Sequence, residues 1–158
     1  MKVVVIDDDP TGSQTVHSCP LLLRWDVDSL RRGLRHASPL LFLLADTRAL
    51  TPTAAAERNR CIAAALDQAL QREGLARDQV LLVSRGDSTL RGHGVLEPEV
   101  LQGAFGLFDA TFHVPAFLEG GRTTVNGVHL LHGEPVHTTP FAQDRLCLLY
   151  TSDAADDC

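Results

Sequence analysis

The sequence has little of what several classes of protein depend on. Lysine occurs only at Lys2, so arginine supplies the other 13 of the 14 basic residues, and 20 acidic residues leave a formal net charge of -6. This balance is unfavourable for nucleic acid, whose phosphates need clustered positive charge. No apolar run reaches the roughly eighteen residues of a membrane span, and no signal-peptide pattern opens the chain. We therefore expect a cytoplasmic protein with neither a membrane nor a nucleic-acid partner.

Cysteine spacing excludes the common metal sites as well. The four cysteines form no CxxC pair and no other spacing typical of metal ligation, so no metal site is expected. We expect free thiols at Cys19, Cys61, Cys147 and Cys158, with metal ligation as the alternative. The phosphate-binding patterns GxGxxG and GxxxxGK[ST] are also absent, so the sequence shows no nucleotide-binding loop.

The apolar residues that are present suffice for one core. They make up 44% of 158 residues, which predicts a single soluble domain. Short continuous apolar runs are typical of parallel strands covered on both faces. Four runs are predicted as strands, the last more weakly: residues 3–6, 40–45, 80–83 and 111–114.

Helical patterns separate these runs. The clearest begins at Thr51, a cap followed by proline, and ends at Gly74. A second helix is expected after Asp28 and a third from Pro98. Their inward-facing residues are Leu30 and Leu34 in the second, and Val100, Leu101, Ala104 and Leu107 in the third. The alternation predicts an α/β fold with an open, mostly parallel sheet and helices on both faces, a Rossmann-like three-layer arrangement that is incomplete at the C-terminus.

The last third of the chain changes character twice. Residues 115–144 are rich in Gly, Thr, His and Pro and are expected to be irregular. The ending "LCLLYTSDAADDC", residues 146–158, differs abruptly from what precedes it and is expected to be a non-native tail, with an ordinary frayed C-terminus as the alternative. The interpretation is therefore one partial domain, residues 1–145.

Polar clusters follow each predicted strand. They are "DDDPTG" (7–12), "ADTRAL" (45–50), "SRGDSTLRGH" (84–93) and "VPAFLEGGRTT" (114–124). Ligands of open parallel sheets bind outside the carboxyl ends of the strands, so these four segments predict one site at one edge.

The residue types at that edge indicate the ligand. Four arginines offer planar forks that suit carboxylate or phosphate: Arg48, Arg85, Arg91 and Arg122. Asp8, Asp9 and Asp87 can accept hydrogen bonds from sugar hydroxyls or hold a cation. A small polyhydroxylated anion would satisfy both sets. Structural roles compete for each residue: a strand-end aspartate can cap a helix, an arginine can form a surface ion pair, and His129, His132 and His137 are expected to be solvated.

One hypothesis is a phosphohydrolase of the haloacid-dehalogenase type. "DDDPT", residues 7–11, fits the DxDxT motif of that family, with Asp7 as nucleophile, Asp9 as general acid/base and Mg²⁺ between carboxylate and phosphate. The later motifs of the family, a downstream lysine and a second acidic pair, are missing from the sequence.

A different set of motifs resembles another family. "DDPTG" (8–12), "TRAL" (47–50), "DSTLRGH" (87–93) and "PAFLEGGRTTVNGVH" (115–129) resemble, in this order, the N-terminal domain of the four-carbon acid sugar kinases, over about residues 3 to 144. The resemblance implies ATP-dependent phosphorylation of a threonate, erythronate or 3-oxo-tetronate. It also implies that this domain holds the sugar acid, whereas ATP and Mg²⁺ bind mostly to a C-terminal nucleotide-binding domain absent from this chain.

The resemblance also implies site residues. Asp8, Asp9 and Asp87 match positions for catalysis, and Thr11, Gly12, Arg48, Ser88, Arg91, Gly121 and Arg122 match positions for substrate binding. Asp7 is additional to the first motif, and Leu118 stands where the family usually has proline. A stand-alone sugar-acid-binding module is the remaining alternative, and the oligomeric state is left open.

Overall fold

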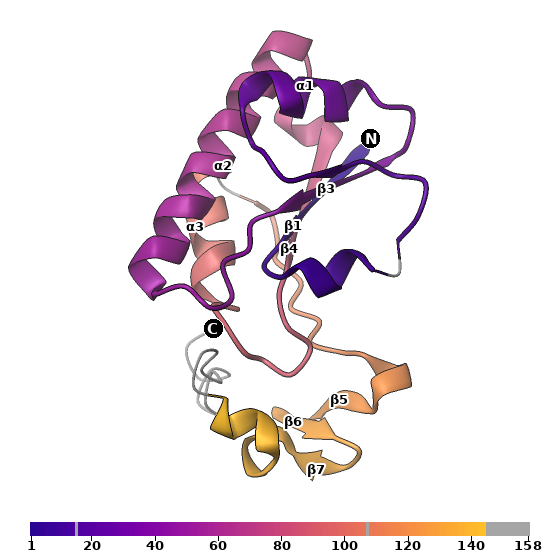
Figure 1. Ribbon diagram of the computed structural model, residues 1–158, viewed down its shortest axis with the longest axis vertical. Coiled ribbons are helices and arrows are strands. Elements are labelled where there is room, and N and C mark those ends of the chain that lie inside the picture. Colours follow the sequence, from indigo (N-terminus) through magenta and orange to yellow (C-terminus); the bar gives the residue numbers. More distant parts are fainter. Residues whose placement is uncertain (15, 107, 145–158) are drawn as a thin grey trace.

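Four parallel strands form the main sheet in the order β2-β3-β1-β4 (Figure 1). The strands are β1 (Lys2–Asp7), β2 (Leu21–Leu22), β3 (Leu40–Leu44) and β4 (Val80–Arg85). The computed structural model describes residues 1–14, 16–106 and 108–144. Asp7 at the end of the central strand is level with Leu44 of β3 and Arg85 of β4, so the three carboxyl ends open onto one edge. The parallel sheet and α/β class predicted from the sequence are confirmed.

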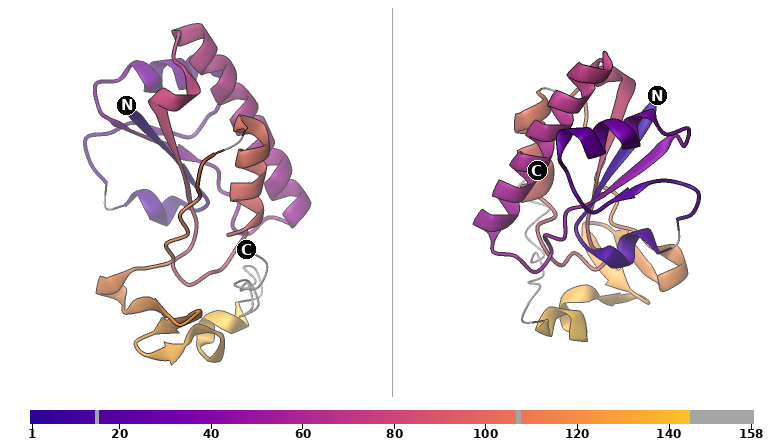
Figure 2. Two further views of the ribbon diagram at one scale, coloured as in Figure 1. Left: turned by 180° about the vertical axis from the view of Figure 1, so that it is seen from behind. Right: turned by 45° about the horizontal axis from the view of Figure 1, so that its top comes forward.

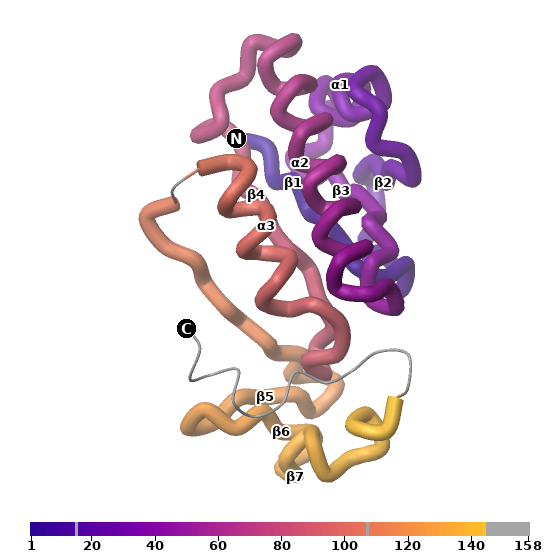
Figure 3. Tube along the Cα trace, turned by 90° about the vertical axis from the view of Figure 1, so that its left-hand side faces the viewer, coloured from indigo at the N-terminus to yellow at the C-terminus, as the bar shows by residue number. Residues whose placement is uncertain are grey.

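Three helices cover one face of this sheet, in front of the strands in Figure 3. They are α1 (Val27–Arg35), α2 (Pro52–Glu73) and α3 (Leu96–Phe105). Alternate residues of β1 and β3 point into the core beneath them, and Val4, Ile6, Leu41 and Leu43 are fully buried there. Among the described residues, α-helices lie on this face only, so the expected layer of α-helices on the other face is not seen.

The helix boundaries follow from caps and from one unexpected buried residue. Thr51 accepts a hydrogen bond from the Ala54 amide 3.3 Å away, and Gly74 ends α2 with φ 66°, as predicted. The helix α1 starts two residues earlier than expected because Asp26 caps it. The helix α3 starts before Pro98 and buries Glu97, Leu101 and Phe105. The expectation for α3 was wrong for Val100, half-buried, and Ala104, exposed, whereas Leu107 lies outside the described residues.

The fourth predicted strand is not a strand. Residues 111–114 are exposed, with Phe112 at 88% and Val114 at 75% of their full accessible surface. A pocket of about 1310 Å³ separates them from the outer edge of β4, so this edge has no strand partner in the described part of the chain. An apolar run can favour a strand, but pairing needs a neighbouring edge within hydrogen-bonding distance.

A second, antiparallel sheet lies beyond the carboxyl ends of the main strands (Figures 1 and 2). It consists of β5 (Arg122–Val125), β6 (Val128–Leu131) and β7 (Glu134–Pro135). The expectation of an irregular segment was therefore wrong. Asn126 and Gly127 form the first turn with φ of 51° and 78°, and Asn-Gly between valines is a strong signal for such a hairpin.

Short 3-10 helices complete the described fold: η1 (Pro10–Ser13), η2 (Arg77–Gln79), η3 (Leu118–Gly120), η4 (Val136–Thr138) and η5 (Pro140–Gln143). Of the helices in residues 1–14, 16–106 and 108–144, none is long and apolar enough to cross a membrane.

Candidate functional site

The centre of the site is a buried ion pair between Asp8 and Arg48. Nε and Nη2 of Arg48 lie 2.9 and 2.7 Å from the two oxygens of Asp8, a bidentate contact that joins the ends of β1 and β3. The side chain of Arg48 is 9% exposed and that of Asp8 is 1% exposed. Burial alone would lower the pKa of Arg48, but the contact with Asp8 outweighs it and raises that pKa, so the guanidinium is charged at any ordinary pH. Arg48 was predicted to bind substrate, and the contacts show that it also fixes Asp8.

Asp9 lies on the other side of Arg48. Its Oδ2 is 3.4 Å from Nη1 of Arg48, and its Oδ1 accepts from the Thr11 amide at 2.8 Å and from the Thr11 hydroxyl. Asp9 thereby caps η1. Burial opposes ionisation, but the hydrogen bonds from Thr11 outweigh it and lower the pKa of Asp9. Thr11 therefore serves Asp9 as a donor, besides the substrate role predicted for it.

The loop after β4 brings Asp87 and Arg91 into a second pair. Nε of Arg91 lies 2.6 Å from Oδ2 of Asp87, which also accepts from the Thr89 hydroxyl. Burial opposes ionisation of Asp87, but these hydrogen bonds outweigh it and lower its pKa. Nη1 of Arg91 lies 2.8 Å from Oδ2 of Asp144, and its guanidinium lies over the Phe141 ring. Arg91 therefore ties the main sheet to the end of the described chain.

Arg122 reaches the same surroundings from β5. Its guanidinium lies over Phe117 and also over Phe141, the ring that Arg91 contacts. Its Nε is buried and has no hydrogen-bond partner among the described residues. A buried donor without an acceptor is costly, so this one is suited to a ligand oxygen. Gly121 precedes it with φ 69° and ends η3, and its missing side chain leaves room for the His132 ring.

His129 holds the second sheet against the loop after β4. Its Nε2 lies 2.7 Å from the carbonyl oxygen of Ser88, and its Nδ1 lies 2.9 Å from the Thr124 hydroxyl. A carbonyl can only accept, so Nε2 is the donor in its contact with Ser88. The ring is only 5% exposed, so the expectation of a solvated His129 was wrong, although His132 and His137 are exposed.

Asp7 lies apart from the other carboxylates. It is fully buried, its Oδ1 is 3.3 Å from Nη1 of Arg85, and its Oδ2 has no hydrogen-bond partner in the described residues. Burial raises the pKa of Asp7, with Arg85 opposing the shift. Gly12 makes this packing possible, because a Cβ there would lie 2.1 Å from Arg85 Nη1 and 2.2 Å from Asp7 Oδ2.

A second buried carboxyl supports the site from behind. Glu97, 3% exposed at the start of α3, accepts a hydrogen bond from the Thr47 hydroxyl beside Arg48. Burial raises the pKa of Glu97. Sequence reasoning missed Glu97, and equally Phe141 and Asp144, because no local pattern distinguishes them from surface residues.

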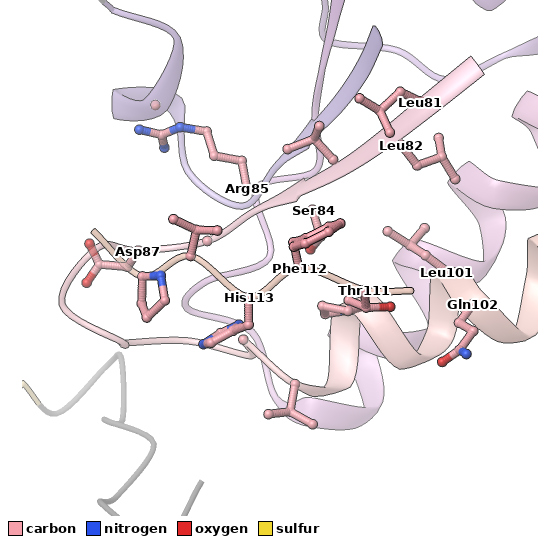
Figure 4. Close-up of a pocket in the computed structure, with 18 of the residues that line it drawn as sticks. Leu81, Leu82, Ser84, Arg85, Asp87, Leu101, Gln102, Thr111, Phe112 and His113 are labelled. Atoms are coloured by element: carbon pink, nitrogen blue, oxygen red, sulfur yellow. The ribbon is translucent and has the colours of Figure 1, made fainter. Parts of the chain in front are cut away.

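The site opens into the pocket of about 1310 Å³. Its polar end is lined by Thr11, Gly12, Arg48, Arg85, Asp87, Ser88, Arg91 and Arg122. In Figure 4, Arg85 and Asp87 lie near the end of β4, and Leu81, Leu82 and Leu101 lie farther along the cavity. Asp8 and Asp9 do not line this end themselves, but both contact Arg48, which does. Across the described ranges, no group of three or more His, Cys, Asp or Glu side chains could hold a metal ion.

An α/β sheet edge that gathers guanidiniums, carboxylates and hydroxyls is typical of a domain that binds small polar anions. The family comparison agrees: residues 3–155 match the model of the sugar-binding N-terminal domain, and the chain belongs to that family. The resemblance to the N-terminal domain of four-carbon acid sugar kinases is thereby confirmed.

One curated relative and two solved structures give this family its context. The chain is 29% identical over 163 residues to the D-erythronate kinase of Heliobacterium modesticaldum, and it spans 98% of its own length but 35% of the kinase. Two crystal forms of a domain of unknown function, DUF1537, from Bordetella bronchiseptica match with TM-scores of 0.77 and 0.75 at 25% identity. The matches cover 99% and 100% of this chain and 40% of theirs, and both structures are domain-swapped dimers with bound citrate.

Proposed function

We propose that this chain is the substrate-binding portion of an ATP-dependent kinase that phosphorylates a four-carbon sugar acid of the threonate, erythronate or 3-oxo-tetronate type. Arg122 carries the proposal, because it lines the pocket and its buried Nε has no hydrogen-bond partner among the described residues, so that its guanidinium has donor capacity left for an anionic oxygen. The similarity to a D-erythronate kinase supports the same class of substrate.

Different side chains bind the carboxylate and the hydroxyl groups of the substrate. Arg122 and Arg91 bind its carboxylate, with Arg48 in support, because planar guanidiniums pair with carboxylates through charge-assisted hydrogen bonds. Asp8, Asp9 and Asp87 accept hydrogen bonds from its hydroxyls, and one of them takes the proton of the attacking hydroxyl. Thr11, Gly12 and Ser88 form the remaining wall of the pocket, and Gly121 supports the site by ending η3 directly before Arg122.

ATP and Mg²⁺ belong, in this proposal, to a nucleotide-binding part of the longer kinase. Phosphoryl transfer depends on positioning and on neutralising charge around the triphosphate. The 158-residue chain should therefore bind the sugar acid and consume no ATP by itself.

Calorimetric titration of the chain with D-erythronate and D-threonate tests the proposal. Erythritol, which has the same carbon skeleton without a carboxylate, is the matched ligand control. Arg122→Ala should weaken binding of the acid by about one to two orders of magnitude. Arg60→Ala, a variant of an exposed arginine paired with Glu57, should bind like the unaltered chain. Equal affinity for erythritol and the acids, or no binding of either acid by a folded chain, would refute the proposal.

The phosphohydrolase alternative requires Asp7 as a nucleophile. Asp7 has no exposed surface and packs against Gly12 and Arg85, which does not favour that role. Abolition of a Mg²⁺-dependent phosphatase activity by Asp7→Asn would establish the alternative. The kinase proposal instead predicts that Asp9→Asn impairs sugar-acid binding and that no phosphatase activity is found.

A further inference from the structure

The arginines of the site differ in how much of their donor capacity is already used. Arg48 directs Nε, Nη2 and Nη1 at Asp8 and Asp9. Arg91 directs Nε at Asp87 and Nη1 at Asp144. These two guanidiniums are already partly engaged by protein carboxylates before a ligand binds.

Arg85 is in a different state. Its one ion pair within the described ranges joins Nη1 to Asp7 Oδ1 at 3.3 Å, which is long for a charge-assisted hydrogen bond. Its side chain is 41% exposed and lines the polar pocket, where Figure 4 shows it near the end of β4. Most of its planar donor fork is therefore available to a ligand.

Asp7, the ion-pair partner of Arg85, holds the guanidinium only weakly. Asp7 is fully buried beside Gly12 and accepts a single long contact from the guanidinium. The charged groups that act on it are Arg85 of β4 and the adjacent Asp8, and the amide of Asp9 also faces it. Burial raises the pKa of Asp7, so loss of Arg85 can be compensated by uptake of a proton.

We propose that Arg85 is a further substrate-recognising residue, which exchanges its contact with Asp7 for an oxyanion of the ligand in the polar pocket. The inference rests on the proposed function and adds to it a second cationic contact, with Asp7 as the resting counter-ion. A bidentate contact with an oxyanion replaces one long hydrogen bond by two charge-assisted ones, which favours the exchange. The oxyanion is the carboxylate of the sugar acid or the phosphoryl group that the kinase reaction adds.

Calorimetry on Arg85→Ala with two ligands distinguishes these sources. If Arg85 binds the carboxylate, affinity for D-erythronate and for D-erythronate 4-phosphate should both fall by about tenfold or more. If it binds the phosphoryl group, only the phosphate ester should lose affinity. Titrations in buffers of different ionisation enthalpy should show proton uptake by the unaltered chain and none by Asp7→Asn. Arg60→Ala serves as the control for charge removal elsewhere.

Unchanged affinity of Arg85→Ala for both ligands would overturn the inference and leave the proposed function standing. Failure of the unaltered chain to bind either ligand would overturn both. Arg85→Lys keeps the charge but not the planar fork, and a partial loss of affinity is expected from it. If the alanine variant does not fold, unaltered affinity in Arg85→Lys together with absence of proton uptake by the unaltered chain would overturn the inference.

Discussion

His129 and Ser88 connect the two sheets of the protein: Nε2 of the buried ring donates to the Ser88 carbonyl at 2.7 Å. Ser88 belongs to the loop that carries Asp87 and Arg91, and His129 belongs to the strand paired with the one that carries Arg122. The two arginines proposed to hold the carboxylate therefore keep their spacing partly through this bond.

We predict that His129→Ala weakens sugar-acid binding although the ring is not proposed to touch the ligand. Two hydrogen bonds are lost, each with a net contribution of about 0.5–1.5 kcal/mol, and the loop and hairpin can separate. Calorimetric affinity for D-erythronate should fall several-fold. His129→Gln, which can restore the donor to Ser88, should recover part of it, and His137→Ala, at an exposed position, should change nothing. An alanine variant that binds normally would contradict this coupling.

In a longer protein that also contains the nucleotide-binding part, Arg91→Ala should impair the use of the sugar acid but not the binding of ATP. Charge-assisted hydrogen bonds contribute about 1.5–3 kcal/mol, so kcat/KM for the sugar acid should fall by about one to two orders of magnitude. The KM for ATP should remain nearly constant. Equal losses for both substrates would indicate damage to the fold and reject the assignment.

Asp87→Asn should reduce stability in a manner that depends on pH. The pKa of Asp87 in the folded protein is below its ordinary value of 3.8, although burial opposes this, because of the hydrogen bonds from Arg91 and Thr89. The carboxylate therefore stabilises the fold above that value, and its contribution is lost as the pH falls through the lowered pKa. Denaturant unfolding should show a deficit of about 1–3 kcal/mol in the variant at neutral pH. A deficit that stays constant down to pH 2 would disagree with this origin.

Gly12→Ala should destabilise the domain through a steric conflict. The added Cβ would lie 2.1 Å from Arg85 Nη1, so the pair with Asp7 must open or the η1 turn must shift. Overpacking of this kind costs about 1–3 kcal/mol. Gly103→Ala in the exposed middle of α3, where a Cβ meets nothing within 4 Å, should instead stabilise by about 0.5–1 kcal/mol. In thermal unfolding, a lower Tm for Gly12→Ala and a higher Tm for Gly103→Ala would confirm the prediction.

The sequence predicted those parts of the site that follow from strand order. Asp8 and Arg48 come together because they follow adjacent parallel strands, and that proximity requires no knowledge of side-chain contacts. The partner of Arg91 could not be found in this way, since Asp144 is 53 residues distant and follows no regular element of the main sheet.

The errors have physical causes of the same kind. The β5–β6 hairpin was missed although Asn126-Gly127 announced it, because the surrounding glycines and histidines were read as a loop. Residues 111–114 have a strand-like composition but no adjacent edge to pair with. Burial of His129 depends on a contact across 41 residues, which no local window contains.

Three successive carboxylates at the end of β1 avoid one another because a strand directs neighbouring side chains to opposite sides. Asp7 goes to Arg85, Asp8 goes to Arg48, and Asp9 leaves the strand to cap η1. Alternation along the strand thus separates the carboxylate of Asp7 from that of Asp8, and the turn into η1 separates Asp9 from both. Inserting one residue within β1 would preserve every side chain but place Asp7 opposite Arg48 and Ile6 opposite Arg85, which would remove the counter-ion from Arg85. The register of β1 is therefore as important to the site as the carboxylates themselves.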